Sequence, residues 1–474
     1  MSELENDGSD LKRHHLQDSA GEETFLDALR EVVGANHVLV SADLRATYET
    51  DWSRRWSGSS LAVVRPSNTS EVSAVLSLCH QNGVPCVPQG GRTGLVGGSV
   101  PVDGEIVVSL ERLTQVGDVD SDMGQLTVGA GVALAAVHNA AQSHGWEFGV
   151  DLASRDSATI GGMIATNAGG TRVVRHGQMR EQVVGIEVVL ADGSVLRGSG
   201  EVLKDNAGYD LAQLIIGSEG TLGIITSARL RLVRSSPFRV VALVGAETLA
   251  GGIELIGRLR RTSGFLSAAE FIDHDAMSVV CDYLNSSSPV AESPWYVLIE
   301  CAGDEDPTAA MSASLGETDE VVDELVAVAI DAPSRNHLWS IRESMPDAIA
   351  RVGIPHKLDV GLPHRLLDEF ADKVRSSVRA SFPDSTVVLF GHLGEGNIHV
   401  NVLGVSPDDD EIDNLVLRLV AEMGGNIASE HGIGRAKTQW LELARTPEEI
   451  RAMYALKAAF DPKKILNPGV ILTQ

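Results

Sequence analysis

The chain has 474 residues, of which 43 % are hydrophobic and 22 % charged, a balance typical of a folded globular protein of two or three domains. A formal charge of −27 argues against nucleic acid or an anionic lipid surface as a general partner. The cysteines form no Cys-x-x-Cys pair, so neither a zinc ribbon nor a redox dithiol is indicated.

The first residues, 1–22, are rich in Asp, Glu, Ser and Gly and lack apolar periodicity, so we expect a flexible tail. They contain no apolar core like that of a secretory signal, and their acidity argues against a mitochondrial presequence. No window approaches the roughly 18 apolar residues of a membrane-spanning helix. These patterns predict a bacterial-type cytoplasmic protein, with peripheral docking at the inner membrane left open.

A strand and a helix precede the first glycine-rich loop. Residues 61–66 read as a strand, and Asn68 begins a helix that Gly83 ends. The next strand, 84–89, runs into the loop 90–98, in which five of nine residues are glycine. Such a loop can present backbone N–H groups to a pyrophosphate. It matches neither a P-loop nor the dinucleotide Gly-x-Gly-x-x-Gly motif, and a connector without ligand explains it about as well.

Two further glycine-rich segments, 157–170 and 215–226, make turns alone a poor explanation. The hairpin pattern between them, at 183–196, indicates an α+β region of short strands. The chain contains, in order, the blocks "PQGGRTGLVGG", "IGGMIATNAGG", "KDNAGYDLAQLIIGSEGTLGIIT" and "FDPKKILNPG".

These four blocks resemble the vanillyl-alcohol oxidase (PCMH-type) flavoproteins, in the branch of D-lactate and D-2-hydroxyglutarate dehydrogenases. The resemblance extends from about Asp51 to the C-terminus. It implies a two-lobed α+β protein: a PCMH-type FAD-binding domain, then an α+β substrate-binding (cap) domain and a short segment that returns to FAD. The corresponding boundaries are 1–22 for the tail, 23–235 for the FAD domain, 236–440 for the cap domain with a metal site, and 441–474 for a C-terminal helical segment.

The resemblance also implies the cofactor contacts. The first loop would bind the FAD pyrophosphate, the second block would lie along the cofactor, the third would belong to its adenosine end, and Asn467 would return to the isoalloxazine side. Arg92 stands where some relatives carry a flavin-linked histidine, so we expect non-covalent FAD. The implied residues are Pro88, Gly90, Gly91, Arg92, Thr93, Gly94, Leu95, Gly97, Gly98, Ser157, Thr159, Gly162, Asn167, Glu219, Gly220, Ile225 and Asn467.

The second lobe begins after a break in the pattern near 235–237. Residues 266–273 and 295–303 read as strands, and the run around 319–330 reads as an amphipathic helix. This mixture predicts an α+β class for the second lobe as well.

The stretch 386–404 reads as a hairpin with a glycine-rich turn after Phe390. Alternation in its second strand places His399 and Asn401 on one face, and the turn lets His392 converge on the same point. Two imidazoles alone are as readily structural groups as metal ligands.

The segment 428–437 offers Glu430 and His431, which we expect at a strand end before a glycine turn. Two histidines and a carboxylate suit a divalent metal, zinc first and Mn²⁺, Co²⁺ or Fe²⁺ less selectively. Spacing alone leaves the metal open. The resemblance implies that His392, His399 and Glu430 are ligands, that His431 is the proton acceptor and that Asn401 contacts substrate.

Arg342 and Lys357 are candidate carboxylate-binding groups. Each by itself reads as a solvated surface charge, but the segment 338–363 resembles the family's substrate-binding stretch, which implies that both hold a carboxylate. Pro346 departs from that pattern, since the hydroxyglutarate dehydrogenases carry a threonine there. Proline removes a hydroxyl and a backbone donor, and we expect it to restart a helix at 345–347.

The sequence therefore predicts FAD-dependent oxidation of a D-2-hydroxy acid to the 2-oxo acid, with D-2-hydroxyglutarate favoured and D-lactate or another D-2-hydroxy acid as the alternative. A second class is an FAD-binding electron-transfer subunit without a substrate site of its own. The electron acceptor (an electron-transfer flavoprotein, a quinone or a cytochrome) and a homodimer are left open.

Overall fold

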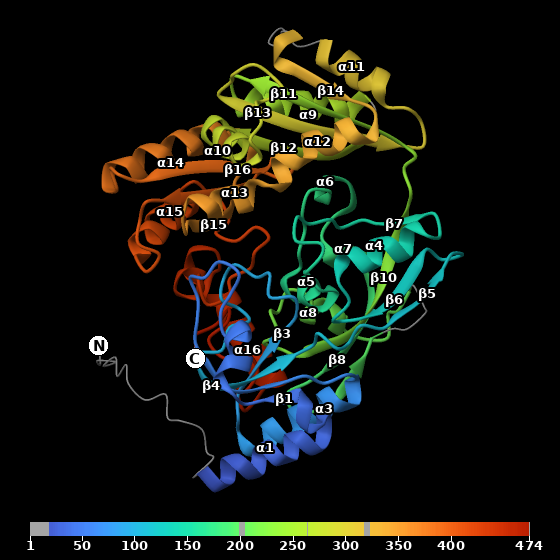
Figure 1. The fold of residues 1–474 in the computed structure, drawn as a ribbon, viewed down its shortest axis with the longest axis vertical. Coiled ribbons are helices and arrows are strands. Elements are labelled where there is room, and N and C mark those ends of the chain that lie inside the picture. The colour runs from blue at the N-terminus through green and yellow to red at the C-terminus, as the bar shows by residue number, and fades with distance from the viewer. Residues whose placement is uncertain (1–18, 199–203, 263, 317–322, 474) are drawn as a thin grey trace.

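The computed structural model describes residues 19–198, 204–262, 264–316 and 323–473. They form two lobes, one above the other in Figure 1, and the C-terminal segment lies against the first lobe. Helix α1 (Ser19–Val33) already begins at Ser19, so the prediction of a flexible tail is wrong for residues 19–22. Phe25, Leu26 and Leu29 are buried, and this apolar stripe holds the helix on the first lobe. The rest of the predicted tail lies outside the described residues.

The first sheet of the first lobe is four-stranded, in the order β1-β2-β4-β3. Helix α3 connects β2 to β3. Its N-cap is Asn68, whose side chain accepts a hydrogen bond from the Glu71 backbone N–H, and it ends at Gly83 with φ of 66°. The predicted helix ends are thus confirmed. The bounds are β1 Val38–Leu39, α2 Ala42–Arg45, β2 Ser59–Val64, α3 Thr69–Asn82, β3 Cys86–Gln89 and β4 Asp103–Ser109.

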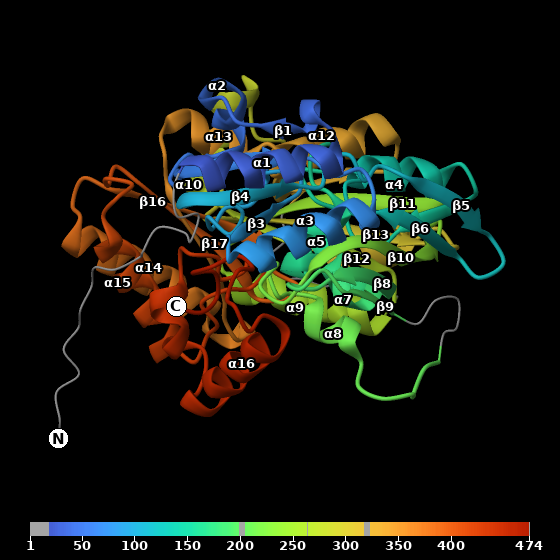
Figure 2. The same ribbon diagram turned by 90° about the horizontal axis from the view of Figure 1, so that it is seen from below.

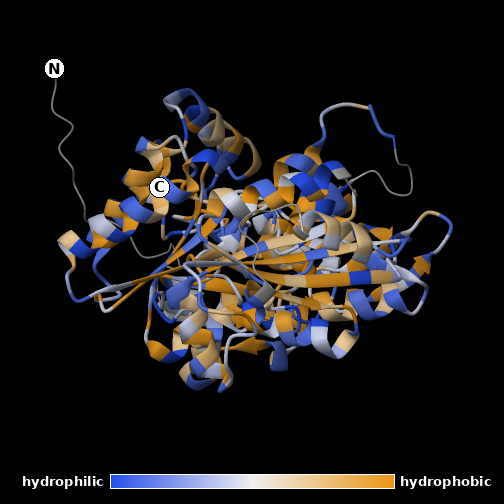
Figure 3. Cartoon of the chain, turned by 90° about the horizontal axis from the view of Figure 1, so that it is seen from above, coloured by the Kyte–Doolittle hydropathy of each residue, from blue (hydrophilic) through white to orange (hydrophobic). Residues whose placement is uncertain are grey.

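The second sheet of this lobe has the order β5-β6-β10-β8-β9, with β7 paired to β10. Both sheets and their helices share one apolar core. Figure 3 views the molecule from above, with the second lobe nearest the viewer, and shows hydrophobic residues along the central strands of the molecule. The bounds are β5 Val116–Asp120, β6 Gln125–Gly129, α4 Leu134–Gln142, β7 Trp146–Phe148, α5 Ile160–Thr166, α6 Val173–His176, α7 Met179–Gln182, β8 Val183–Val189, β9 Val195–Arg197, α8 Leu211–Ile215 and β10 Ile224–Arg234.

The second lobe is built on a seven-stranded antiparallel sheet, β14-β11-β13-β12-β16-β17-β15. One face packs on α9, α11, α14 and α15, and the other on α10, α12 and α13. The bounds are β11 Phe238–Ala246, α9 Leu249–Thr262, β12 Leu266–Asp273, α10 His274–Leu284, β13 Trp295–Gly303, α11 Thr308–Gly316, β14 Val326–Ala329, α12 Ala332–Glu343, α13 Met345–Val352, β15 His356–Gly361, α14 Leu367–Ser381, β16 Thr386–His392, β17 Asn397–Leu403 and α15 Asp410–Glu422.

The predicted helix around 319–330 is wrong where the structure describes it. Residues 326–329 form edge strand β14, which pairs with β11, and 323–325 form a short 3-10 turn. The alternating valines of "VAVA" suit a pleated strand better than a helix. Residues 319–322 lie outside the described part of the chain.

The chain end returns to the first lobe. The 3-10 helix η5 (Thr438–Leu443) packs on the second lobe, where Trp440 joins the apolar core. Helix α16 (Pro447–Phe460) follows it and lies beside the first lobe in Figure 2. The N–H of Cys86 in β3 donates to Ile465 O at 2.8 Å, and the Asn467 N–H donates to Cys86 O at 2.8 Å. Residues 465–467 therefore pair with β3, the strand that leads into the glycine-rich loop.

Candidate active site

A cavity of about 700 Å³ lies between the two lobes. The first lobe supplies most of the loop 90–99, parts of the segments 151–171 and 219–225, and Trp52. The second lobe supplies Arg342, Lys357, His392, His399, Asn401, Glu430 and His431. The structure thus brings together all of the substrate, metal and proton-transfer residues predicted from the sequence.

The glycine-rich loop packs tightly against the second block at Gly90 and Gly91, where a side chain has no room. A Cβ on Gly90 would lie 2.3 Å from Thr159 Oγ1, and one on Gly91 would lie 1.8 Å from the carbonyl oxygen of Ser157. Thr159 Oγ1 is buried and has no hydrogen-bond partner among the described residues. A close backbone approach with a free buried hydroxyl suits a bound anionic cofactor such as FAD.

Most of the predicted cofactor residues line this cavity, including Pro88, Arg92 and Ile225. Arg92 has φ of 58°, and its guanidinium lies 4.6 Å from the centre of the Tyr48 ring. The other predicted residues on the cavity wall are Gly90, Gly91, Thr93, Gly94, Leu95, Gly98, Ser157, Thr159, Gly162, Glu219 and Gly220.

Three predicted cofactor residues, Gly97, Asn167 and Asn467, do not line the cavity. Gly97 has φ of +67° and meets the Trp56 ring. Asn167 ends α5 with φ of 50°, and its side chain donates to Gln178 Oε1 at 2.8 Å. These contacts shape the loops around the cavity, and a direct role at the cofactor stays a prediction.

Asn467 connects the chain end to two loops of the cavity. Its Nδ2 donates to Gly98 O at 2.8 Å and to Glu219 O at 2.7 Å. The carboxylate of Glu219 does not point to open space: it accepts the backbone N–H groups of Ile433 and Gly434, each at 2.8 Å. Burial raises the pKa of Glu219 to about 7.

The hairpin of β16 and β17 presents its polar residues to the cavity, as predicted. Phe390 pairs with His399, and His392 pairs with Asn397, so these side chains share one face of the sheet. Ile398, Val400 and Val402 face the opposite way and join the core with α14 and α15. Asn401 is buried on the cavity side, and its Nδ2 donates to the carbonyl oxygens of Val388 and His399 at 3.4 and 3.3 Å.

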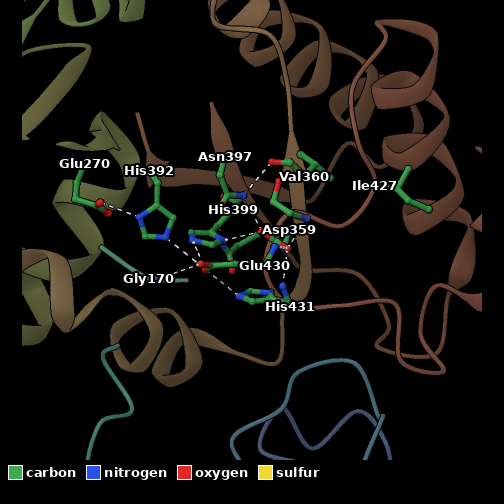
Figure 4. Close-up of polar contacts among 12 residues, drawn as sticks. Gly170, Glu270, Asp359, Val360, His392, Asn397, His399, Ile427, Glu430 and His431 are labelled. Atoms are coloured by element: carbon green, nitrogen blue, oxygen red, sulfur yellow. Dashed lines mark hydrogen bonds and ion pairs between the residues drawn. The ribbon is translucent and has the colours of Figure 1, made fainter. Parts of the chain in front are cut away.

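Three imidazoles converge on one carboxylate oxygen (Figure 4). Glu430 Oε1 lies 3.4 Å from His392 Nε2, and 3.5 Å from Nε2 of both His399 and His431. Ligand atoms about 2.1 Å from a tetrahedral ion stand about 3.4 Å apart. These three distances to Glu430 are compatible with ligands of a zinc-type divalent ion, and Glu430 Oε2 accepts from the Gly170 N–H at 3.2 Å.

Carboxylates orient two of these imidazoles. Glu270 Oε1 bonds His392 Nδ1 at 2.7 Å, and Asp359 Oδ1 lies 3.7 Å from His399 Nδ1. Such partners fix the ring orientation of metal-binding histidines. Burial acts to lower the pKa of His392, but the charges of Glu270 and Glu430 outweigh it and raise that pKa well above its usual value. Burial lowers the pKa of His399 well below the usual value.

Glu430 and His431 lie in an irregular loop, so their predicted place at a strand end is wrong. In the described structure, the nearest strand-like pairing before them is an isolated bridge between Gly361 and Asn426. Sequence reasoning also missed Asp359, a fully buried carboxylate under this loop. A signal existed, because Asp359 stands between two apolar strand residues and shares its face with Lys357.

The basic side chains are both anchored in the cavity wall. Arg342 is 5 % exposed, donates from Nε to Glu270 Oε2 at 2.7 Å and covers the Phe390 ring at 4.7 Å. Lys357 Nζ lies 4.4 Å from the centre of the Trp52 ring. Glu270 and Trp52 were not found from the sequence. Pro346 lies in the first turn of α13, next to the end of α12, so the predicted helix restart is confirmed, and Pro346 lines the cavity.

His431 lies as close to Glu430 as His399, one of the histidines predicted to bind the metal. The two imidazole rings stack with centroids 5.2 Å apart. Asp359, His399, Glu430 and His431 together could hold a metal ion. The positions alone therefore allow His431 either a ligand or a proton-acceptor role.

Two family descriptions match the chain: "FAD binding domain" over residues 60–199 and "FAD linked oxidases, C-terminal domain" over residues 236–471. The solved structure of p-cresol methylhydroxylase with substrate bound has the same fold, with a TM-score of 0.77 at 16 % identity, covering 95 % of this chain and 97 % of that one. The molecule is an FAD-linked oxidoreductase of the PCMH type. The predicted fold class and the use of FAD are thereby confirmed.

Relatives with assigned names identify the branch of the FAD-linked oxidoreductases to which the chain belongs. The D-2-hydroxyglutarate dehydrogenase of Xanthomonas citri pv. viticola is 40 % identical over 434 residues, which are 89 % of this chain and 91 % of the relative. The mitochondrial D-2-hydroxyglutarate dehydrogenase of Bos taurus is 39 % identical over 462 residues, covering 95 % and 84 %. The chain belongs to the D-2-hydroxyglutarate dehydrogenase family of FAD-dependent enzymes. Within the described residues, no helix has the length and hydropathy needed to span a bilayer.

Proposed function

We propose that this chain oxidises D-2-hydroxyglutarate to 2-oxoglutarate, with FAD as the redox cofactor and a divalent metal ion, zinc first, assisting. One observation carries the proposal: two basic side chains, three histidines and a carboxylate face the same cavity as the glycine-rich loop. The substrate named for the relatives suits the two basic side chains of the cavity, because a 2-hydroxy dicarboxylate needs cations around it.

When bound, FAD supplies a two-electron acceptor and the metal lowers the proton affinity of the substrate hydroxyl. Arg342 and Lys357 bind carboxylate and set the direction of the substrate; Arg342 does so rigidly because Glu270 and Phe390 hold its guanidinium. His431 accepts the hydroxyl proton at Nε2. The C2 hydrogen leaves with its electron pair, so the alcohol becomes a ketone and two electrons pass on to an external acceptor.

The alternatives concern substrate and partner. Pro346 on the cavity wall leaves D-lactate or another D-2-hydroxy acid as the second candidate. A relay subunit without substrate is disfavoured, because it has no use for Arg342 and Lys357 beside a histidine cluster. The electron acceptor (an electron-transfer flavoprotein, a quinone or a cytochrome), non-covalent attachment of FAD, a homodimer and a cytoplasmic or peripheral location stay predictions.

A substrate panel tests the proposal. The FAD-loaded enzyme with an artificial dye acceptor is expected to show its highest kcat/KM with D-2-hydroxyglutarate. This value should exceed that for the L-enantiomer at least about 100-fold, because the L-enantiomer cannot place both its hydroxyl and its carboxylates correctly. D-lactate and enzyme without substrate serve as controls. Faster turnover of D-lactate would select the second candidate, and no turnover of any 2-hydroxy acid would leave the relay subunit.

The affinity for substrate is expected to depend on Lys357. Burial lowers its pKa to about 8, so the side chain is cationic below pH 8 and neutral above it. The KM for the hydroxy acid should rise above pH 8, by about tenfold per pH unit at the limit, as the cation is lost. In Lys357→Arg this rise should vanish, since arginine stays charged. An identical pH dependence of KM in both proteins would rule out the role of Lys357.

A further inference from the structure

The loop 429–434 carries two reactive side chains, Glu430 and His431, yet it has no helix or strand to fix it. Its backbone is held by side chains instead. Asp359 Oδ2 accepts three successive N–H groups, from Ser429 at 2.9 Å, Glu430 at 2.7 Å and His431 at 2.9 Å. The positions of both reactive side chains thus depend on one carboxylate oxygen.

The same loop is held from the other side by Glu219. Its two carboxylate oxygens take the N–H groups of Ile433 and Gly434, each at 2.8 Å. Glu219 belongs to the first lobe and Asp359 to strand β15 of the second lobe, and both are buried. Five of the six residues of the loop are therefore bound through their backbone by two carboxylates from different lobes.

The glycines of the loop are shaped for this arrangement. Gly432 has φ of +84°, and a Cβ there would lie 2.6 Å from Glu219 Oε1. Gly434 has φ of +55°, and a Cβ there would lie 2.2 Å from Val96 O. Two residues with a side chain in these places would push Glu219 and the glycine-rich loop away.

We propose that Glu219 and Asp359 form a carboxylate clamp that positions Glu430 and His431 against the cofactor cavity, Asp359 setting the loop on the second lobe and Glu219 setting it relative to the first. This inference rests on the proposed roles of Glu430 and His431. Glu219 is then a positioning residue: its carboxylate bonds the backbone N–H groups of Ile433 and Gly434, and it acts on His431 through that backbone.

Further contacts hold the Asp359 end of the clamp. The fully buried Asp359 carboxylate accepts from Asn397 Nδ2 at 2.7 Å through its other oxygen, Oδ1. Lys437 Nζ also donates to the carbonyl oxygens of Asp359 and Ile427, at 3.0 and 2.6 Å.

The test is the variant Glu219→Gln, which keeps the size of the side chain but turns an NH₂ group towards one of the two N–H groups. Its FAD-saturated kcat with D-2-hydroxyglutarate should fall about 10- to 100-fold, because a displacement of the base by about 1 Å costs that much. KM should change less than about threefold, since Arg342 and Lys357 are untouched.

Glu105→Gln is the matched control. Glu105 is also a buried glutamate of the first lobe whose carboxylate accepts two backbone N–H groups, from Val102 and Asp103, each at 2.8 Å, and it does not line the cavity. Its kcat should stay within about twofold of the unmodified enzyme even where its melting temperature falls as much as that of Glu219→Gln.

The outcomes separate the clamp from its alternatives. Unchanged FAD-saturated kcat in Glu219→Gln, or weaker FAD binding as the only defect, would overturn the clamp while leaving the proposed function intact. If the unmodified enzyme turns over no 2-hydroxy acid, the proposed function itself is wrong. If Glu219→Gln does not fold, the variant Gly432→Ala tests the clamp instead, because the added methyl group presses on Glu219 Oε1 from the loop side. The kcat of Gly432→Ala should fall while FAD stays bound. An unchanged kcat would overturn the clamp.

Discussion

Replacing His431 by alanine is expected to lower kcat about 10²- to 10⁴-fold while leaving FAD bound, because the substrate hydroxyl loses its proton acceptor. Dye reduction under saturating D-2-hydroxyglutarate measures the effect, and the visible flavin spectrum checks the cofactor. His337→Ala, a change of an exposed histidine on α12, is the matched control and should keep full turnover.

Metal content decides between the two roles that the geometry leaves to His431. As proton acceptor, His431 can be removed without loss of the ion, so the variant should bind as much divalent metal as the unmodified enzyme. A variant that loses its metal would make His431 a ligand, and one that keeps its turnover would remove it from the chemistry altogether.

The variant Glu430→Gln is expected to lose the metal itself. Three imidazoles face Glu430 Oε1 at 3.4 to 3.5 Å, and the neutral amide no longer supplies the negative charge that balances a cation among them. Metal affinity should fall at least about tenfold, and turnover with it by a comparable or larger factor. Elemental analysis of the purified protein, together with kcat, measures both.

A chelator provides an independent arm of the same experiment. The unmodified enzyme should lose activity on chelation and regain it when Zn²⁺ is added, whereas Glu430→Gln should respond to neither. Glu343→Gln is the matched control, because Glu343 lines the same cavity but pairs with Arg155 at 2.6 Å and, among the described residues, forms no ion pair with a histidine. The metal content of this variant should not change. Turnover that chelators leave intact would contradict the catalytic role of the ion.

Local patterns predicted the parts of the site that depend on neighbours in the sequence. Period-two alternation placed His399 and Asn401 together, and the glycine-rich turn placed His392 beside them. The N-cap at Asn68 and the helix restart at Pro346 are equally local and were equally readable.

The supporting carboxylates could not be found in this way, because topology creates their contacts. Glu270 meets His392 only because β12 pairs with β16 in the sheet, and Asp359 reaches the loop of Glu430 across about 70 residues of sequence. A buried charge inside an apolar strand indicates that the charged side chain has a polar partner, but it does not identify that partner. The strand at 326–329 was misread for a related reason: pairing with β11, not local periodicity, decides its conformation.

Glu270 couples the two parts of the proposed site. One of its oxygens accepts from Arg342 and the other bonds His392, so the proposed anchor for the substrate and the proposed ligand for the ion are held by the same fully buried group. The proposed roles therefore make substrate choice and metal binding depend on one carboxylate. We expect that a redesign of the acid pocket through Arg342 has to preserve Glu270, and that it changes the electrostatic environment of the proposed metal site at the same time.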